Sequence, residues 1–300
     1  MYSIKAITSL TGLTAGTLRA WERRYDCITP NRNANGRRSY SQQDLEKLKL
    51  LMNLTRNGHA IGKIAHLSCE QLRHFQNQSS EQNDQQKSNL FNQIIDALSH
   101  YQIERCEQLL KRALLAYEPL DYAKEILLPA LHQIGQLWHE QKINTAQEHM
   151  FSSCVKRIVL TMINSLHQPS MNNPSMLFAT LCGEQHELGI LLGCLIAASQ
   201  RYTCYYVGAD LPAPDLIDAC RHLKPQIIMI GMINSPLANS TTDHLEQLIA
   251  FADTSQSKIW LAGAGAEDWF GKHTSTLDNC TLIIDIEDFH TQIRHRHFAK

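Results

Sequence analysis

The chain contains 300 residues, of which 43% are hydrophobic and 19% are charged, and this globular composition excludes wholesale disorder. Its longest uncharged apolar run, Leu188–Ala198, is much shorter than the roughly 20 residues of a membrane-spanning helix, and its cysteines form no C-x-x-C pair, which indicates a protein of the reducing cytoplasm. Residues 1–75 carry 12 Lys and Arg against 5 Asp and Glu, whereas the rest of the chain is acidic, so the N-terminal segment favours a polyanionic partner.

The first 75 residues have the pattern of a helix-turn-helix followed by a basic hairpin. Apolar residues at helical spacing predict a helix over Ile4 to Leu10, Gly12 ends it, and Thr14 begins a second helix that contains TLRAWERRY. The stretch PNRNANGRRSY, with Asn35-Gly36 as its turn signal, predicts a basic wing. Further helices are expected over Leu45 to Arg56 and from Ile61.

The stretches TGLTAGTLRAWERRY, RRSY and GHAIGKIA resemble the MerR family of winged-helix regulators in order and spacing. In that family the second helix enters the major groove of DNA and the wing contacts the backbone. The resemblance therefore implies five DNA-contacting residues: Arg19, Arg23, Arg24, Arg38 and Tyr40. For Arg23 and Arg24 the alternative is a solvated side chain, or an ion pair with Glu22 or Asp26.

Residues 76–88 (QNQSSEQNDQQKS) lack hydrophobic side chains and predict a flexible linker. Residues 89–167 then predict a four-helix bundle, because apolar residues recur there at helical spacing. Its third helix is expected from Leu120 to Gln141 with a kink at Pro129, and a capping box at Asn144 begins the fourth. A break follows at residues 167–175.

The third and fourth helices of this bundle meet at a corner rich in aromatic and titratable side chains. Trp138 and His139 end the third helix, and Glu148 and His149 lie near the start of the fourth. The residue types leave three interpretations open. The corner is a plain surface with a half-buried tryptophan, a zinc site formed by His139, Glu148 and His149, or part of a cofactor site.

Residues 176–300 alternate strand-like and helical runs, which predicts a doubly wound parallel α/β domain of the flavodoxin-like kind. The strands are expected at Met176–Leu181, Tyr202–Val207, Gln226–Met232, Lys258–Ala262 and Thr281–Asp285. Ligands of such sheets bind beyond the carboxyl ends of the strands.

The loop after the first of these strands carries a carboxylate and an imidazole in the order Glu184-Gln185-His186, followed by Gly189. A carboxylate that holds one ring nitrogen leaves the other free as a metal ligand, and a glycine permits close approach of a bulky group. The loop resembles the cobalamin-binding signature of corrinoid proteins, which usually reads D-x-H-x-x-G and here begins with Glu184. That resemblance implies that His186 is the lower cobalt ligand.

The same signature has later elements that this chain matches only in part. Its S-x-L serine is replaced by Gly231, with Ser235 nearby, and its glycine pair reads Gly263-Ala264-Gly265. By resemblance the cofactor-binding residues of the α/β domain are Glu184, His186, Gly189, Asp210, Leu211, Ser235 and Gly263.

A basic head, a helical bundle and a corrinoid-type domain in this order resemble the CarH/LitR photoreceptor repressors over essentially the whole chain. That group carries a Trp-His pair and then a Glu-His pair, as Trp138-His139 and Glu148-His149 stand here. The resemblance implies that adenosylcobalamin binds with its adenosyl group enclosed by Trp138, Glu148 and His149. It also implies that His139 becomes the upper cobalt ligand after light.

The function implied by this resemblance is a light-responsive, non-enzymatic repressor. It would bind double-stranded promoter DNA in the dark as a homo-oligomer, expected to be a tetramer, and leave it after photolysis of the cobalt–carbon bond. Two alternatives stay open, a light-independent cobalamin-sensing regulator and a corrinoid carrier for methyl transfer. The basic N-terminal segment argues against the carrier.

Overall fold

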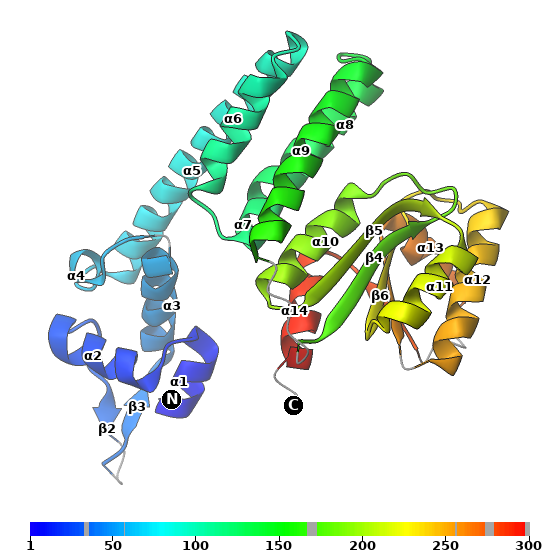
Figure 1. Cartoon of the computed structure of the whole chain (residues 1–300). Coiled ribbons are helices and arrows are strands. Elements are labelled where there is room, and N and C mark those ends of the chain that lie inside the picture. Colours follow the sequence, from blue (N-terminus) through cyan, green and yellow to red (C-terminus); the bar gives the residue numbers. More distant parts are fainter. Residues whose placement is uncertain (33–35, 57, 167–172, 256, 274–278, 298–300) are drawn as a thin grey trace. The chain divides into compact units, whose positions relative to one another are not determined.

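The computed structural model describes residues 1–32, 36–56, 58–166, 173–255, 257–273 and 279–297 (Figure 1). Asn35 of the expected wing turn and residues 167–172 of the expected break lie outside this range. The chain forms two compact units, Met1–Asn89 and Leu90–Lys300. Within the described residues, no helix is both long and apolar enough to cross a membrane.

The first unit is a winged helix-turn-helix built around one apolar core. Its elements are β1 (Tyr2–Ser3), α1 (Ile4–Thr11), α2 (Ala15–Tyr25), β2 (Asn31–Arg32), β3 (Arg38–Tyr40), α3 (Gln42–Arg56), α4 (Ile61–Ile64) and the start of α5 (Cys69–Ser99). The strands pair antiparallel in the order β1-β3-β2. Gly12 ends α1 with a φ of 71°, and the Thr14 hydroxyl caps α2 by accepting the N–H of Thr17, so the expected turn between the two helices is confirmed.

The expected linker, residues 76–88, is helical, because α5 runs without interruption from Cys69 to Ser99. The prediction of an irregular backbone was wrong. The segment lacks apolar side chains but also lacks Gly and Pro, and its Gln, Glu and Lys residues have high helix propensity. The boundary between the two compact units falls inside this helix, between Asn89 and Leu90.

The helical bundle of the second unit consists of the end of α5, α6 (Ile103–Leu114), a composite third helix and α9 (Thr145–Leu166). The composite helix joins α7 (Pro119–Tyr122), the π-helical turn η1 (Ala123–Leu127) and α8 (Leu128–His139). Leu128 donates its N–H to the carbonyl of Ala123, five residues earlier. This wider turn stands immediately before Pro129, which has no N–H to continue the regular ladder.

The α/β domain contains five parallel strands in the order β5-β4-β6-β7-β8, which is the flavodoxin-like order. The strands are β4 (Ser175–Leu181), β5 (Thr203–Leu211), β6 (Ile227–Gly231), β7 (Lys258–Ala262) and β8 (Cys280–Ile283). The helices are α10 (Leu188–Ser199), α11 (Ala213–Leu223), α12 (Asn239–Thr254), α13 (Ala264–Lys272) and α14 (Ile286–His297). The strand order reverses beside β4, so the carboxyl ends of β4 and β6 form the ligand-binding edge of this sheet.

Two apolar cores lie on the two faces of the sheet. One core contains residues of α11, α12 and α13, and the other joins α10 and α14 to the bundle helices, chiefly through α9 (Figure 1). The bundle and the α/β domain, which the sequence analysis treats as separate segments, therefore share buried side chains and form one unit.

Candidate cofactor site and DNA-binding surface

The loop between β4 and α10 holds an imidazole against a buried carboxylate. The Glu184 side chain is 2% exposed, and its Oε1 lies 2.5 Å from Nδ1 of His186 and accepts the His186 N–H at 2.9 Å. Its Oε2 accepts the backbone N–H groups of Ile233 and Asn234 at 2.7 and 2.8 Å. Sequence reasoning paired Glu184 with His186 but missed these two backbone donors.

The electrostatics of this loop keep Glu184 ionised. Burial alone raises the pKa of the carboxyl, but the backbone donors of Asn234, His186 and Ile233 and the His186 ring outweigh it, so the pKa lies below its ordinary value. A carboxylate at Nδ1 fixes the proton there and leaves the Nε2 lone pair free. Because the His186 side chain is 60% exposed, Nε2 is available to a metal from outside the sheet.

Asp210, at the end of β5, holds the same loop from the other side. Its Oδ1 accepts a hydrogen bond from the Gly183 N–H at 2.8 Å, and its Oδ2 accepts one from the Gln185 side-chain amide at 2.8 Å. The structure thus places Asp210 beside the histidine loop, where it orients backbone and side chain. Leu211 differs, because it packs partly buried against the core below the loop and accepts the Cys182 N–H through its carbonyl.

The glycines of the predicted signature have different environments. Gly189 is exposed, and a Cβ added there would meet nothing within 4 Å. Gly263 has a φ of 107°, and a Cβ there would lie 2.4 Å from the Met232 carbonyl oxygen. Gly231, where the signature has serine, would place a Cβ 2.7 Å from Ile190 Cγ2, so in this packing the position has no room for a side chain.

Ser235 follows β6 and borders a cavity of about 310 Å³ next to Glu184. The residues that line this cavity are Gly183, Glu184, Asn234, Ser235, Pro236, Leu237, Ala238 and Thr241. The Ser235 hydroxyl lies 3.4 Å from a carboxylate oxygen of Asp268. The cavity thus lies between the histidine loop and the connection from β6 to α12.

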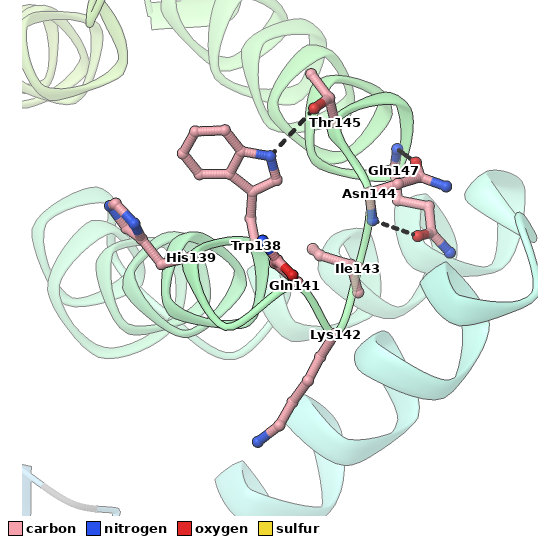
Figure 2. Close-up of a pocket in the computed structure, with 8 residues that line it drawn as sticks. All are labelled: Trp138, His139, Gln141, Lys142, Ile143, Asn144, Thr145 and Gln147. Atoms are coloured by element: carbon pink, nitrogen blue, oxygen red, sulfur yellow. Dashed lines mark hydrogen bonds between the residues drawn. The ribbon is translucent and has the colours of Figure 1, made fainter.

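The bundle corner forms a second, larger cavity of about 640 Å³ (Figure 2). Its lining residues are Trp138, His139, Gln141, Lys142, Ile143, Asn144, Thr145 and Gln147. Trp138 is 41% exposed, donates Nε1–H to Thr145 Oγ1 at 3.2 Å, and has its ring centroid 5.3 Å from that of His139. A large planar ring held by one hydrogen bond beside an imidazole suits a flat aromatic ligand.

Glu148 and His149 form a pair of their own on the first turns of α9. Glu148 Oε2 lies 2.5 Å from His149 Nδ1, and its other oxygen accepts the Ser152 hydroxyl. Neither residue lines the cavity beside Trp138. The zinc interpretation of this corner is wrong for the described residues, among which no group of three His, Cys, Asp or Glu could hold a metal ion.

The basic residues of the first unit fall into an exposed set and an ordered set. Arg19, Arg23 and Arg24 of α2 are exposed. Arg38 is partly exposed and donates Nε–H to Glu22 Oε2 at 2.9 Å. Both carboxylate oxygens of Glu22 accept hydrogen bonds from β3, one from Arg38 and one from Tyr40. The ion-pair partner of Glu22 is therefore Arg38 and not Arg23 or Arg24.

The predicted DNA contact of Tyr40 does not agree with its position in the structure. Its side chain is completely buried, and its hydroxyl donates to Glu22 Oε1 at 2.7 Å. Burial and this hydrogen bond raise the pKa of the Tyr40 phenol. A residue of the core cannot contact DNA in this conformation. Instead, Tyr40 ties the wing to α2.

The comparisons with known proteins agree with this architecture. Residues 2–70 match the MerR HTH family of regulatory proteins, and residues 90–162 match a B12 binding domain. The HTH-type transcriptional repressor CarH of Myxococcus xanthus is 28% identical over 270 residues, covering 88% of this chain and 89% of CarH. The repressor CarA of the same organism is 26% identical, covering 88% of this chain and 87% of CarA.

Among solved structures, the monomethylamine corrinoid protein of Methanosarcina barkeri matches with a TM-score of 0.53 and 14% identity, over 69% of this chain and 99% of that chain. At this identity the likeness shows the fold alone. A MerR-type helix-turn-helix is thus followed by a B12 binding domain, and CarH and CarA are similar to the chain over most of its length, which together support a cobalamin-binding transcriptional regulator.

Proposed function

We propose that this regulator responds to light. It binds promoter DNA in the dark with adenosylcobalamin bound, and it leaves the DNA after photolysis of the cobalt–carbon bond. The observation that carries the proposal is that two imidazole-bearing sites belong to one compact unit, His186 at the sheet edge and the Trp138–His139 corner of the bundle.

The described residues fit a corrinoid. His186 has a side chain that is 60% exposed and a buried carboxylate at Nδ1, which leaves Nε2 as the donor that a cobalt ion would need below the ring. Ile233, beside this loop, is 43% exposed and offers an apolar contact to a macrocycle. Bound adenosylcobalamin supplies a cobalt that accepts an axial imidazole and a cobalt–carbon bond that light breaks.

Helix α9 connects the two sites. Glu148 and His149 lie near its first turn, and Lys156, two turns later, pairs with Glu187, the neighbour of His186. Eight residues of helix span about 12 Å along the axis, so α9 separates the Glu148–His149 pair from the Lys156–Glu187 pair by about this distance. In this arrangement Trp138, Glu148 and His149 would enclose the adenosyl group, and His139 would bind from above once that group has left.

The DNA-binding half of the proposal assigns phosphate contacts to Arg19, Arg23, Arg24 and Arg38 of the first unit. We further propose that the dark form is a homo-oligomer, a tetramer, and that loss of the adenosyl group releases its subunits. Loss of the adenosyl group and binding of the His139 imidazole would shift a bundle that has two packing states towards the second of them.

The test uses the full chain with adenosylcobalamin. Absorption spectra and size-exclusion profiles are recorded in the dark and after illumination. We expect photolysis, a bis-imidazole spectrum and a smaller species in the light, and His139→Ala should photolyse without the bis-imidazole spectrum. Equal elution volumes before and after photolysis would contradict light-driven release and favour light-independent cobalamin sensing.

A further inference from the structure

Glu187 is the centre of a cluster that joins the bundle to the histidine loop, and sequence reasoning did not single it out. The Lys156 ammonium of α9 forms an ion pair with Glu187, and the Tyr206 hydroxyl of β5 donates to the other carboxylate oxygen. The Lys156 ammonium also lies 5.9 Å from the centroid of the Tyr206 ring. The Glu187 side chain is 18% exposed and that of Lys156 is 38% exposed, so solvent screens the carboxylate of this pair less than the ammonium.

The position of Glu187 ties it to the proposed lower ligand. It follows His186 directly, and its carbonyl accepts the Leu191 N–H at 3.0 Å at the start of α10. Glu184 Oε1 contacts both the backbone N–H and Nδ1 of His186, so the ring is held relative to its own backbone. Any displacement of Glu187 therefore moves the backbone on which the His186 ring is oriented.

A second ion pair between the same layers provides a matched control. Lys124 of η1 pairs with Glu287 of α14, with side chains 43% and 58% exposed. This pair also joins the bundle to the α/β domain, but Glu287 lies on α14 and not on the histidine loop, and Lys124 lies in η1, more than ten residues before Trp138 on the composite helix. It should contribute to docking without influencing the histidine loop.

We propose that Glu187 is a positioning residue that couples the bundle corner to His186 through Lys156 and Tyr206. The inference rests on the proposed function, because it needs a ligand that contacts both sites. A group seated at the corner sets the position of α9, Lys156 transmits this position to Glu187, and Glu187 sets the backbone at His186. Coupling of this kind is reciprocal, so ligation at His186 also favours the corner-occupied position of α9.

The experiment compares the affinities for adenosylcobalamin and methylcobalamin in the dark. The two compounds share the corrin, and only the first has an adenosyl group to occupy the corner. The dissociation constant of methylcobalamin divided by that of adenosylcobalamin measures how much the corner contributes to binding. We expect Glu187→Gln and Lys156→Met to reduce this ratio by about fivefold or more, the usual lower range of coupling between sites.

The controls separate coupling from a purely structural role. Lys156→Arg keeps the positive charge and should restore the wild-type ratio, and Glu287→Gln should leave the ratio unchanged. Circular dichroism on each variant confirms folding, and Lys156→Met remains informative if Glu187→Gln fails to fold.

The remaining outcomes are distinct. An equal loss of affinity for both compounds in Glu187→Gln, with an unchanged ratio, would overturn the coupling role. A wild-type protein that binds neither compound would instead overturn the proposed function.

Discussion

Two imidazole–carboxylate pairs in this protein have the same contact and different surroundings. In both, a glutamate oxygen lies 2.5 Å from a histidine Nδ1. Glu184 is 2% exposed and also accepts three backbone N–H groups, whereas Glu148 is 25% exposed and also accepts one serine hydroxyl. The first pair is therefore built into the edge of the sheet, and the second can rearrange.

This difference suits a switch. A ligand that stays in place needs a donor whose tautomer and direction are fixed before binding. A group that must leave needs contacts that can separate at small cost, and the Glu148–His149 pair near a helix start satisfies that need. Under the proposed function, His186 would therefore have a permanent role and the bundle corner a state-dependent one.

The largest effect is expected for Glu184→Gln. The amide keeps the shape of the side chain but loses the charge that orients His186, and its NH₂ group faces the N–H donors now bound to the carboxylate. Affinity for cobalamin should fall about 10–100-fold, the usual cost of losing a group that orients a metal ligand. Titration followed by absorption measures this loss of affinity. A smaller loss than in Glu148→Gln would contradict the more important role given to the Glu184–His186 pair.

A second prediction concerns the interior of the bundle, where Cys106 and Cys154 are fully buried, in contrast to the exposed corner. Burial raises the pKa of the Cys106 and Cys154 thiols from the ordinary 9.0 to about 11. The unfolded chain loses these protons near pH 9, while the folded chain keeps them until about pH 11. The contribution of these two thiols to the free energy of unfolding should be constant below about pH 9, fall by about 1.4 kcal/mol per thiol for each pH unit between about 9 and 11, and level off above that.

Urea unfolding at pH 8 and pH 10 checks this slope. The double variant Cys106→Ala/Cys154→Ala should show a shallower fall than the wild type. An identical fall in both proteins would mean that these thiols are not the source of the pH dependence.

Glu148→Gln should have a more modest effect than Glu184→Gln. The pair that it breaks is partly exposed, so the loss of one charge-assisted hydrogen bond should cost about 1 kcal/mol, or roughly fivefold in adenosylcobalamin affinity. Binding of methylcobalamin should change by less than about twofold. A similar loss for both compounds, measured in the dark, would show that Glu148 does not act through the adenosyl group.

The smallest effect is expected in the DNA-binding unit, where Glu22 orders Arg38 much as Glu184 orders His186. Arg38→Ala should weaken binding to all DNA sequences by about threefold and reduce the slope of affinity against salt by about one. Arg73→Ala removes the same charge from a residue that pairs with Glu46, and it serves as the control. Equal salt slopes for both variants would exclude Arg38 as a phosphate contact.

Much of the fold could be predicted because short-range patterns decide it. The Thr14 cap, the Gly12 turn and the apolar strands β4, β6 and β7 are local features, and each lies where its pattern indicates. The β4–α10 loop was found in the same way, because Glu184 and His186 are two residues apart.

The features that escaped prediction depend on contacts between distant residues or on weak local signals. The burial of Tyr40 needs Glu22 from another element, and the Glu187 cluster joins α9, the β4–α10 loop and β5. No spacing rule in the sequence links Lys156 to Glu187. Helix formation across residues 76–88 was missed for another reason, since a polar composition suits a solvated helix as well as a linker.

The central claim of the proposed function is that His186 would bind the cobalt from below in place of the cofactor's own base. Electron paramagnetic resonance of the reduced, cobalt(II) form of the complex tests it, using protein that contains histidine labelled with the spin-one-half isotope of nitrogen. If His186 is the axial ligand, the nitrogen splitting changes from a triplet to a doublet on labelling, and His186→Ala abolishes this response. A triplet that persists in the labelled protein would show that the cofactor's own base remains on the metal, which would contradict the account.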